Sequence, residues 1–283
     1  MNSRAVLPLG ENCHLGMALT RFGHHEASLF RWADVPLARL LAFLESRDGL
    51  KAGGCNARPA VPAPLSGGER RPAEWDEALA GVLAAHPEGE RPPHGDSLFS
   101  GPTAFRFAGT TLGTLDHAEM RERLSQAPAD ARINTIVFDA DGDSYVHGVQ
   151  LSLAEAARLS PDAIRFANAT KIAHLTRKFL IEIQTGAPVA VRLEWAPVVD
   201  AEPFLRLGGA LRRLNSAVTL YIVAPAGGFE GERDAARFVG LRTPLPSRSD
   251  VVNVTRTLPE LSALFVSWSV APAGAEKPYI FDI

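Results

Sequence analysis

Short apolar runs alternate with amphipathic stretches along most of this chain. Runs rich in β-branched side chains predict buried strands at 134–139, 188–193 and 218–223. Apolar residues spaced three and four apart predict helices at 151–159, 164–185 and 203–214. Because helices of this length between strands provide crossover connections, the pattern predicts an α/β fold with a largely parallel central sheet flanked by helices.

The two ends of the chain extend the same pattern. An apolar lead-in at 5–9 predicts a first strand, and the spacing of the apolar residues at 13–22 predicts a helix directly after it. Pro36 suits the first turn of a second helix that runs to Leu44. Near the other end, the apolar runs 251–254 and 264–268 predict two more strands.

Two stretches interrupt this alternation. Residues 48–71 and 87–103 are rich in Gly, Pro, Ala and Ser, which indicates long irregular surface loops, and residues 72–85 between them have the spacing of a helix. Since neither stretch repeats, we interpret both as insertions. The sequence therefore predicts one α/β domain spanning 1–283 with long Pro/Gly-rich loops.

Composition excludes several classes of protein. The chain has 283 residues, is 46% hydrophobic and carries a formal net charge of −3, which does not suit a nucleic-acid or membrane-surface binder. No apolar run is long enough to span a bilayer, and the first residues lack the pattern of a signal peptide. The two cysteines, Cys13 and Cys55, form no metal-ligand or disulfide pattern. We expect a cytoplasmic protein without a metal or other resident cofactor.

The first candidate for chemistry is Cys13, which follows the first strand through a Gly10-Glu11-Asn12 turn and precedes a helix. Helix N-termini direct backbone N–H groups and a positive dipole at such a side chain. These surroundings stabilise the thiolate, which is the nucleophilic form of cysteine. The alternative is that Cys13 is a small buried apolar residue with no reactivity.

A second candidate follows the strand that ends at Asp139. The segment after it contains Asp141, Asp143 and His147, and we expect it to be a loop at the carboxyl end of that strand, where ligands of parallel sheets bind. His147 is the predicted base because imidazole titrates near neutrality and can hold the thiol proton. Asp141, Asp143 or Asp34 would fix the tautomer of the ring. The alternative interpretation of His147 is a solvated loop histidine without a catalytic role.

The remaining predicted site residues surround the cysteine. Backbone N–H groups of Cys13 and His14, assisted by Asn12, would form an oxyanion site after the Gly10 turn. The His14 side chain would point about 100° away from Cys13 if both lie on the helix. Trp32 either anchors its segment against the first helix or shapes the cleft.

Two segments near the start of the chain resemble a known family. Leu9-Gly10-Glu11-Asn12-Cys13 and Ser28-Leu29-Phe30-Arg31-Trp32 resemble the S-L-G-x-x-C and P-F-D-W elements of the bacterial papain-like cysteine peptidase family. Tyr145-Val146-His147 resembles its F-x-H element. The helix at 172–180 and the strand at 188–192 are similar to later elements, so that the resemblance spans roughly 5–225.

The resemblance implies a Cys/His dyad that acts through a thioester, in proteins often associated with cell-surface polysaccharide genes. The resemblance leaves both hydrolysis and acyl transfer open as reactions. A distantly similar class of proteins with a G-N-C start binds coenzyme A, so coenzyme A is a further expected ligand if the reaction is acyl transfer. Two positions depart from the family. Arg31 replaces an acidic residue, and Gly148 replaces the aspartate that commonly follows the histidine.

The residues leave two other functions open. One is a non-catalytic α/β binding module in which Cys13 only packs. The other is a glycosyltransferase-like protein, because Asp139-Ala140-Asp141 has the form of a D-x-D metal motif. For each function the expected partner is a small molecule, peptide or glycan, with no nucleic acid and no membrane insertion. The sequence leaves the oligomeric state open.

Overall fold

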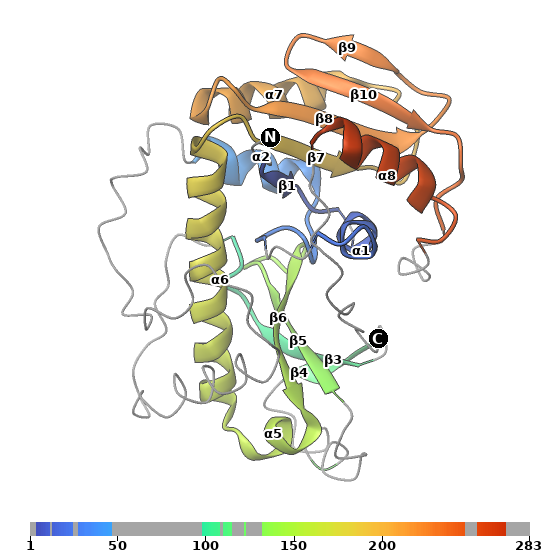
Figure 1. Cartoon of the computed structure of the whole chain (residues 1–283). Helices are drawn as coiled ribbons and strands as arrows, with labels where there is room; N and C mark the ends of the chain where they lie inside the picture. The colour runs from blue at the N-terminus through green and yellow to red at the C-terminus, as the bar shows by residue number, and fades with distance from the viewer. Residues whose placement is uncertain are drawn as a thin grey trace. The chain divides into compact units, whose positions relative to one another are not determined.

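The computed structural model describes residues 4–11, 13–24, 28–46, 98–107, 110–114, 122, 132–246 and 254–269. Contacts divide the chain into two compact units (Figure 1). Unit 1 comprises Met1–Ala52, Asp143–Val146 and Arg177–Phe281, and unit 2 comprises Gly53–Gly142, His147–Thr176 and Asp282–Ile283. The single domain spanning 1–283 stays a prediction. The insertion at 48–71, the helix at 72–85 and most of the insertion at 87–103 lie outside the described residues.

Unit 1 contains the predicted parallel sheet. Its strands are β1 (Val6–Pro8), β7 (Val189–Leu193), β8 (Thr219–Pro225), β10 (Ala236–Leu241) and β9 (Gly231–Arg233), and they lie side by side in that order. The pairs β1–β7, β7–β8 and β8–β10 are parallel, and only β9 runs antiparallel to its neighbour. The fold is therefore mixed α/β with a mostly parallel sheet, as predicted.

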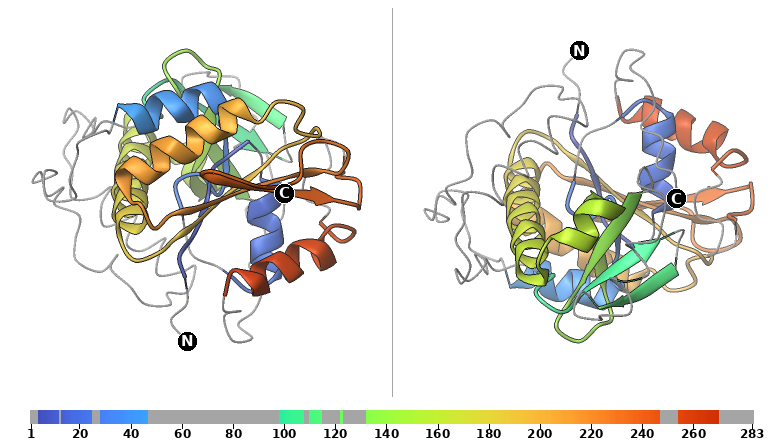
Figure 2. Two further views of the ribbon diagram at one scale, coloured as in Figure 1. Left: turned by 90° about the horizontal axis from the view of Figure 1, so that it is seen from above. Right: turned by 90° about the horizontal axis from the view of Figure 1, so that it is seen from below.

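Helices cover both faces of this sheet, as Figure 2 shows. The helices α1 (His14–Arg21) and α8 (Leu258–Ser267) lie on one face, and α2 (Leu37–Glu45) and α7 (Glu202–Leu214) lie on the other. Apolar side chains of α1, such as Leu15 and Leu19, pack with Leu261 and Phe265 of α8 against strand residues such as Val191. Burial of these side chains removes apolar surface from water on this face of the sheet.

The β1–β7 pair marks a change of face in unit 1. The helix that follows β1, α1, lies on one face, whereas the helix that follows β7, α7, lies on the other. When neighbouring parallel strands lead to opposite faces, the chain leaves an opening beyond their carboxyl ends, where α/β proteins bind ligands. The fold therefore directs attention to the residues directly after Pro8 and Leu193.

Unit 2 contains a second sheet. Strands β6 (Tyr145–Ser152), β5 (Arg132–Phe138), β3 (Thr103–Phe107) and β4 (Thr110–Thr114) are neighbours in that order, and β6 belongs to unit 2 from His147 on. The helices are α5 (Leu153–Arg158) and α6 (Pro161–Gln184), of which α6 belongs to unit 2 up to Thr176. Its core joins strand residues such as Phe105, Ile133 and Val149 to Ile164 and Ala167 of α6.

One predicted strand was wrong, and several strand pairings were not predicted. Residues 264–267 belong to α8 and Trp268 is its C-cap residue, because Leu261, Phe265 and Trp268 follow a helical spacing and are buried together. The β3–β4 and β3–β5 pairs are antiparallel and were not predicted. The β9–β10 hairpin was also missed, and residues 251–253 of another predicted strand lie outside the described residues.

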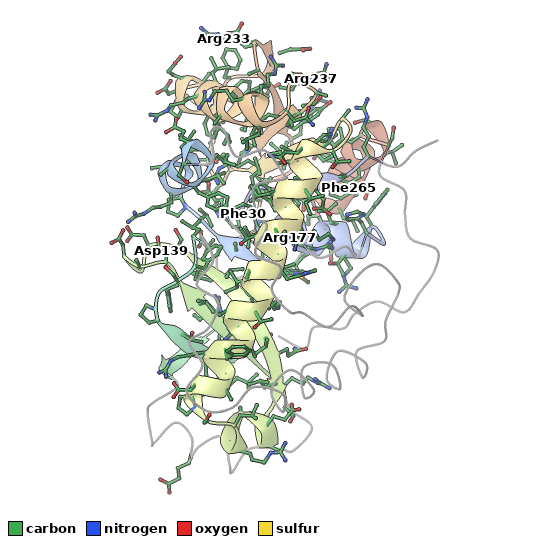
Figure 3. All side chains as sticks on the ribbon, turned by 90° about the vertical axis from the view of Figure 1, so that its left-hand side faces the viewer. Phe30, Asp139, Arg177, Arg233, Arg237 and Phe265 are labelled. Carbon is green, nitrogen blue, oxygen red and sulfur yellow. The ribbon has the colours of Figure 1, made fainter. Side chains whose placement is uncertain are left out.

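An aromatic cluster supports the start of unit 1. Phe30 forms an isolated bridge with Leu9 and contacts the rings of Phe43 and Phe179, at centroid distances of 5.7 and 5.0 Å. Phe30 is fully buried, whereas Arg233 and Arg237 lie on the β9–β10 hairpin; all three are labelled in Figure 3. Within the described parts of the chain, no helix has both the length and the apolar character needed to cross a membrane.

Candidate functional site

Cys13 is placed where the sequence predicts it. It is the N-cap residue of α1, follows the carboxyl end of β1 and is half-buried. Its carbonyl oxygen accepts a hydrogen bond of 2.9 Å from the backbone N–H of Met17, while its thiol forms no capping hydrogen bond. The positive end of the α1 dipole therefore lies beside this half-buried cysteine.

The turn between β1 and Cys13 has an unusual backbone. Gly10 has φ 79° and is buried, and an added Cβ there would lie 3.2 Å from the Cβ of Val35. Glu11 has φ 76°, a left-handed conformation that costs energy in a residue with a side chain. Asn12, the predicted oxyanion residue, lies outside the described residues. Two successive left-handed residues thus position the cysteine.

A buried arginine fixes this turn. Arg192, on β7, has 1% of its surface exposed, and its Nη1 donates to the carbonyl oxygens of Leu9 (3.1 Å) and Val35 (3.0 Å). Its Nη2 donates to Glu11 at 2.6 Å, and its Nε donates to Glu194. The planar guanidinium group therefore joins the carboxyl ends of β1 and β7 and offsets the strain at Glu11. Arg192 was not among the predicted site residues.

His14 does not extend the exposed part of the site. Its side chain is fully buried, and its Nε2 atom lies 2.8 Å from the hydroxyl of Thr257 at the start of α8. The ring is also 6.3 Å from that of Trp195. The His14 side chain therefore joins α1 to α8. The oxyanion role of its backbone N–H group stays a prediction.

The first departure from the family pattern has a structural reason. Arg31 is buried, and its Nη2 donates to the Thr20 hydroxyl (2.8 Å) and to the carbonyl oxygens of Gly16 and His24. A carboxylate here would face carbonyl oxygens instead of satisfying them. Trp32 is half-buried and packs on α1 as the predicted anchor, with the Arg31 guanidinium 5.5 Å from its ring.

His147 lies on a strand, so the prediction of a loop was wrong. It is half-buried in β6, and its neighbour Gly148 is buried under the side chains of Asn168 and Thr135. A Cβ on Gly148 would lie 2.0 Å from Asn168 Oδ1 and 2.4 Å from Thr135 Oγ1. Asn168 Oδ1 accepts hydrogen bonds from Thr135 Oγ1 and Val149 N, so it cannot retreat easily. The second departure, glycine in place of aspartate, is therefore required by packing.

The predicted aspartates are dispersed. Asp143 is exposed in unit 1 and forms an ion pair of 3.1 Å with Arg39. Asp34, on β2 (Ala33–Asp34), is half-buried and pairs in register with Tyr145. In unit 2, Asp141 is exposed whereas Asp139 is buried, which gives little support to the D-x-D interpretation. Cys13 belongs to unit 1 and His147 to unit 2, so the dyad stays a prediction.

Electrostatics keep the His147 ring neutral. Burial lowers its pKa to about 3, and the positive charges of Arg106 and Lys171 act in the same direction. Burial also lowers the pKa of Lys171 to about 8, and its Nζ donates to the carbonyl oxygen of Gly148. A ring in these surroundings accepts a proton only where a negative charge compensates it.

The low pKa of His147 predicts acid sensitivity. Below pH 6.5 the unfolded chain protonates this ring while the folded chain does not until about pH 3, so the free energy of unfolding falls as the pH decreases through that window. Between pH 7.5 and 5 we expect a loss of about 2 kcal/mol that His147→Gln lacks. Urea unfolding at both pH values, followed by circular dichroism, measures it. His174→Gln, a change at another histidine of unit 2, should retain the wild-type loss; equal losses in wild type and His147→Gln would contradict the prediction.

Comparison of the chain with protein-family models, with curated proteins and with solved structures found no match. The resemblance to papain-like peptidases therefore stays a prediction from the quoted motifs. The candidate site is defined by this chain's own geometry: a partly exposed Cys13 at the N-terminus of α1, after a turn that Arg192 fixes.

Proposed function

We propose that the chain is a thiol-dependent enzyme of acyl transfer or hydrolysis with Cys13 as its nucleophile. The observation that carries the proposal is the half-buried Cys13 at the N-terminus of α1, beyond the carboxyl ends of β1 and β7. A helix N-terminus favours thiolate over thiol, and this edge of a parallel sheet is where ligands bind. The substrate is a small molecule, peptide or glycan that contains an ester, thioester or amide.

The proposed reaction has two steps. The Cys13 thiolate attacks the carbonyl carbon, the bond to the leaving group breaks, and the leaving group takes up a proton to depart as an alcohol, thiol or amine. Water or a hydroxyl group of an acceptor then attacks the thioester, loses its proton and releases the thiolate. In this proposal, first-turn N–H groups of α1 stabilise the negative oxygen of each tetrahedral intermediate.

Alkylation by iodoacetamide tests the state of the thiol. In a Cys55→Ser variant, Cys13 is the only thiol, and we expect half of its maximal alkylation rate below about pH 7.5, whereas an ordinary thiol titrates near 8.5. Mass spectrometry over a pH series gives the rate, with the Cys13→Ser, Cys55→Ser double variant as background. A midpoint at or above 8.5 would show that the helix does not activate Cys13.

An activated ester tests the covalent step. With p-nitrophenyl acetate as the probe, the Cys55→Ser variant should form a single acetyl adduct on Cys13, detected by intact mass and peptide mapping. Adding His147→Gln then decides the predicted role of that ring: slower formation or loss of the adduct supports a proton-transfer role, and unchanged rates exclude it. The urea midpoint of each variant controls for folding.

A non-catalytic binding module is the second candidate. It is favoured by the structural use of Arg31 and Gly148, the two positions at which the resembled family has carboxylates. Under this function Cys13 forms no acetyl adduct above the level of a denatured control. The same experiment therefore separates the two candidates.

A further inference from the structure

Two loops at the carboxyl edge of the unit 1 sheet are joined through their backbones. Residues 194–201 follow β7 and residues 226–230 follow β8. The N–H group of Phe229 donates to the carbonyl oxygen of Val198 at 2.6 Å. Gly228 allows this close approach, because an added Cβ there would overlap the Val198 carbonyl group. Val198 itself is buried, so this contact fixes both loops on the sheet.

The joined loops present two apolar side chains to solvent. Val199 has 92% of its surface exposed, and Phe229 has 38%. The Phe229 ring packs edge-on against the buried ring of Phe238 on β10, with 4.9 Å between the centroids, so the ring is held in place although part of it lies in water. Single exposed apolar side chains are common, whereas these two adjoin on separate loops. We call them the Val199–Phe229 patch.

Exposed carboxylates border the patch. Asp200 and Glu230 each directly follow a patch residue, and Glu202 begins α7. All three are exposed, and none of them forms an ion pair within the described part of the chain. Against them stands Arg233, whose guanidinium carbon lies 6.0 Å from the centroid of the Phe229 ring (Figure 3). The border is therefore acidic, and it repels the phosphate groups of nucleic acids and anionic lipids.

We propose that the Val199–Phe229 patch binds a protein segment in which an apolar side chain is flanked by lysine or arginine. The apolar side chain of the partner covers Val199 and Phe229, and its cations pair with the carboxylates of Asp200 and Glu230. A fixed aromatic ring with a polar border has the anatomy of a binding hot spot. This surface is independent of the proposed thiol chemistry, because it uses no residue of the site at Cys13.

Selection from a random peptide library displayed on phage tests the chemistry of the partner. The full-length protein is the immobilised target, and a Val199→Asn variant removes the phage that bind elsewhere. Val199 is almost fully exposed, so this variant should keep the urea midpoint of the wild type. We expect the remaining peptides to combine Leu, Ile, Phe or Trp with Lys or Arg. Enrichment of acidic or uncharged peptides, or no enrichment over the variant, would overturn the proposal.

Fluorescence anisotropy with a synthetic peptide of the enriched sequence measures each contribution. Val199→Asn should raise Kd at least about fivefold and Phe229→Ser at least about tenfold. Glu230→Gln should raise Kd about twofold or more at low salt and less at high salt, because ions screen the lost attraction. Val266→Asn, a change at another exposed valine of unit 1, on α8, should alter Kd by less than about twofold.

Two results would contradict the assignment of this surface. Equal Kd values for Val199→Asn and Val266→Asn would place the peptide away from the patch. A dimer of the wild type in analytical ultracentrifugation that Val199→Asn dissociates would show that a second copy of the chain, and not a basic segment of another protein, covers the patch. We expect the sedimentation of wild type and Val199→Asn to be the same.

Discussion

Replacing Arg192 by leucine is expected to lower the free energy of unfolding by about 3–5 kcal/mol. The leucine would leave the carboxylates of Glu11 and Glu194, and the carbonyl oxygens of Leu9 and Val35, without their shared donor. Breaking one side of a buried ion pair is costly because the other charge stays buried and uncompensated. Urea unfolding monitored by circular dichroism measures the loss.

An exposed arginine provides the matched control for this change. Arg206 forms an ion pair of 2.7 Å with Glu45 on the surface of unit 1, and Arg206→Leu should cost far less stability than Arg192→Leu because solvent screens this pair. Arg192→Lys keeps the charge but lacks the planar fork, so we expect an intermediate loss. If the Arg192→Leu and Arg206→Leu variants have the same free energy of unfolding, the guanidinium group does not hold the turn before Cys13.

Gly148→Asp, which introduces the residue that the resembled family has after its histidine, is expected to destabilise the protein by about 3 kcal/mol or more. The added Cβ alone would overlap Asn168 Oδ1 and Thr135 Oγ1, and the carboxylate would be placed in a buried layer. Urea unfolding and the yield of soluble protein measure the effect.

Two further variants separate the causes. Gly148→Ala adds only the overlapping Cβ and should account for about 1–3 kcal/mol of the loss. Gly142→Asp places the same side chain in the same unit where a Cβ meets nothing within 4 Å, so only its φ of 80° opposes it. A Gly148→Asp protein as stable as Gly142→Asp would show that the Asn168 and Thr135 side chains move aside at little cost.

The parallel sheet was predictable because its strands are short apolar runs. Residues 188–193 and 218–223 correspond to β7 and β8, since buried parallel strands read as continuous β-branched segments. The antiparallel strands were missed for the opposite reason. β9 contains only Gly, Glu and Arg, and β4 is interrupted by Gly113, so neither has an apolar signature. In α8, the period of three and four was mistaken for a strand because only residues 264–268 were considered.

The position of the nucleophile Cys13 could be predicted from the sequence, but the residues that hold the turn before it were not predicted. The strand, turn and helix around Cys13 follow directly from the apolar pattern and Gly10. Arg192 could have been found, because a charged residue inside a fully buried strand run needs partners of opposite charge. Lys171 gave no such signal, since a lysine on a mixed helix face usually lies in solvent. Its position opposite Gly148 depends on tertiary packing.

The short antiparallel strand β9 limits how the sheet of unit 1 can associate. Unpaired strand edges invite other chains to extend them, which leads to fibrils or swapped dimers. This edge offers only three residues, all exposed, with Glu232 and Arg233 flanked by a glycine. A three-residue segment with both signs of charge is a poor template for intermolecular pairing. The β9 edge of this sheet is therefore protected against aggregation.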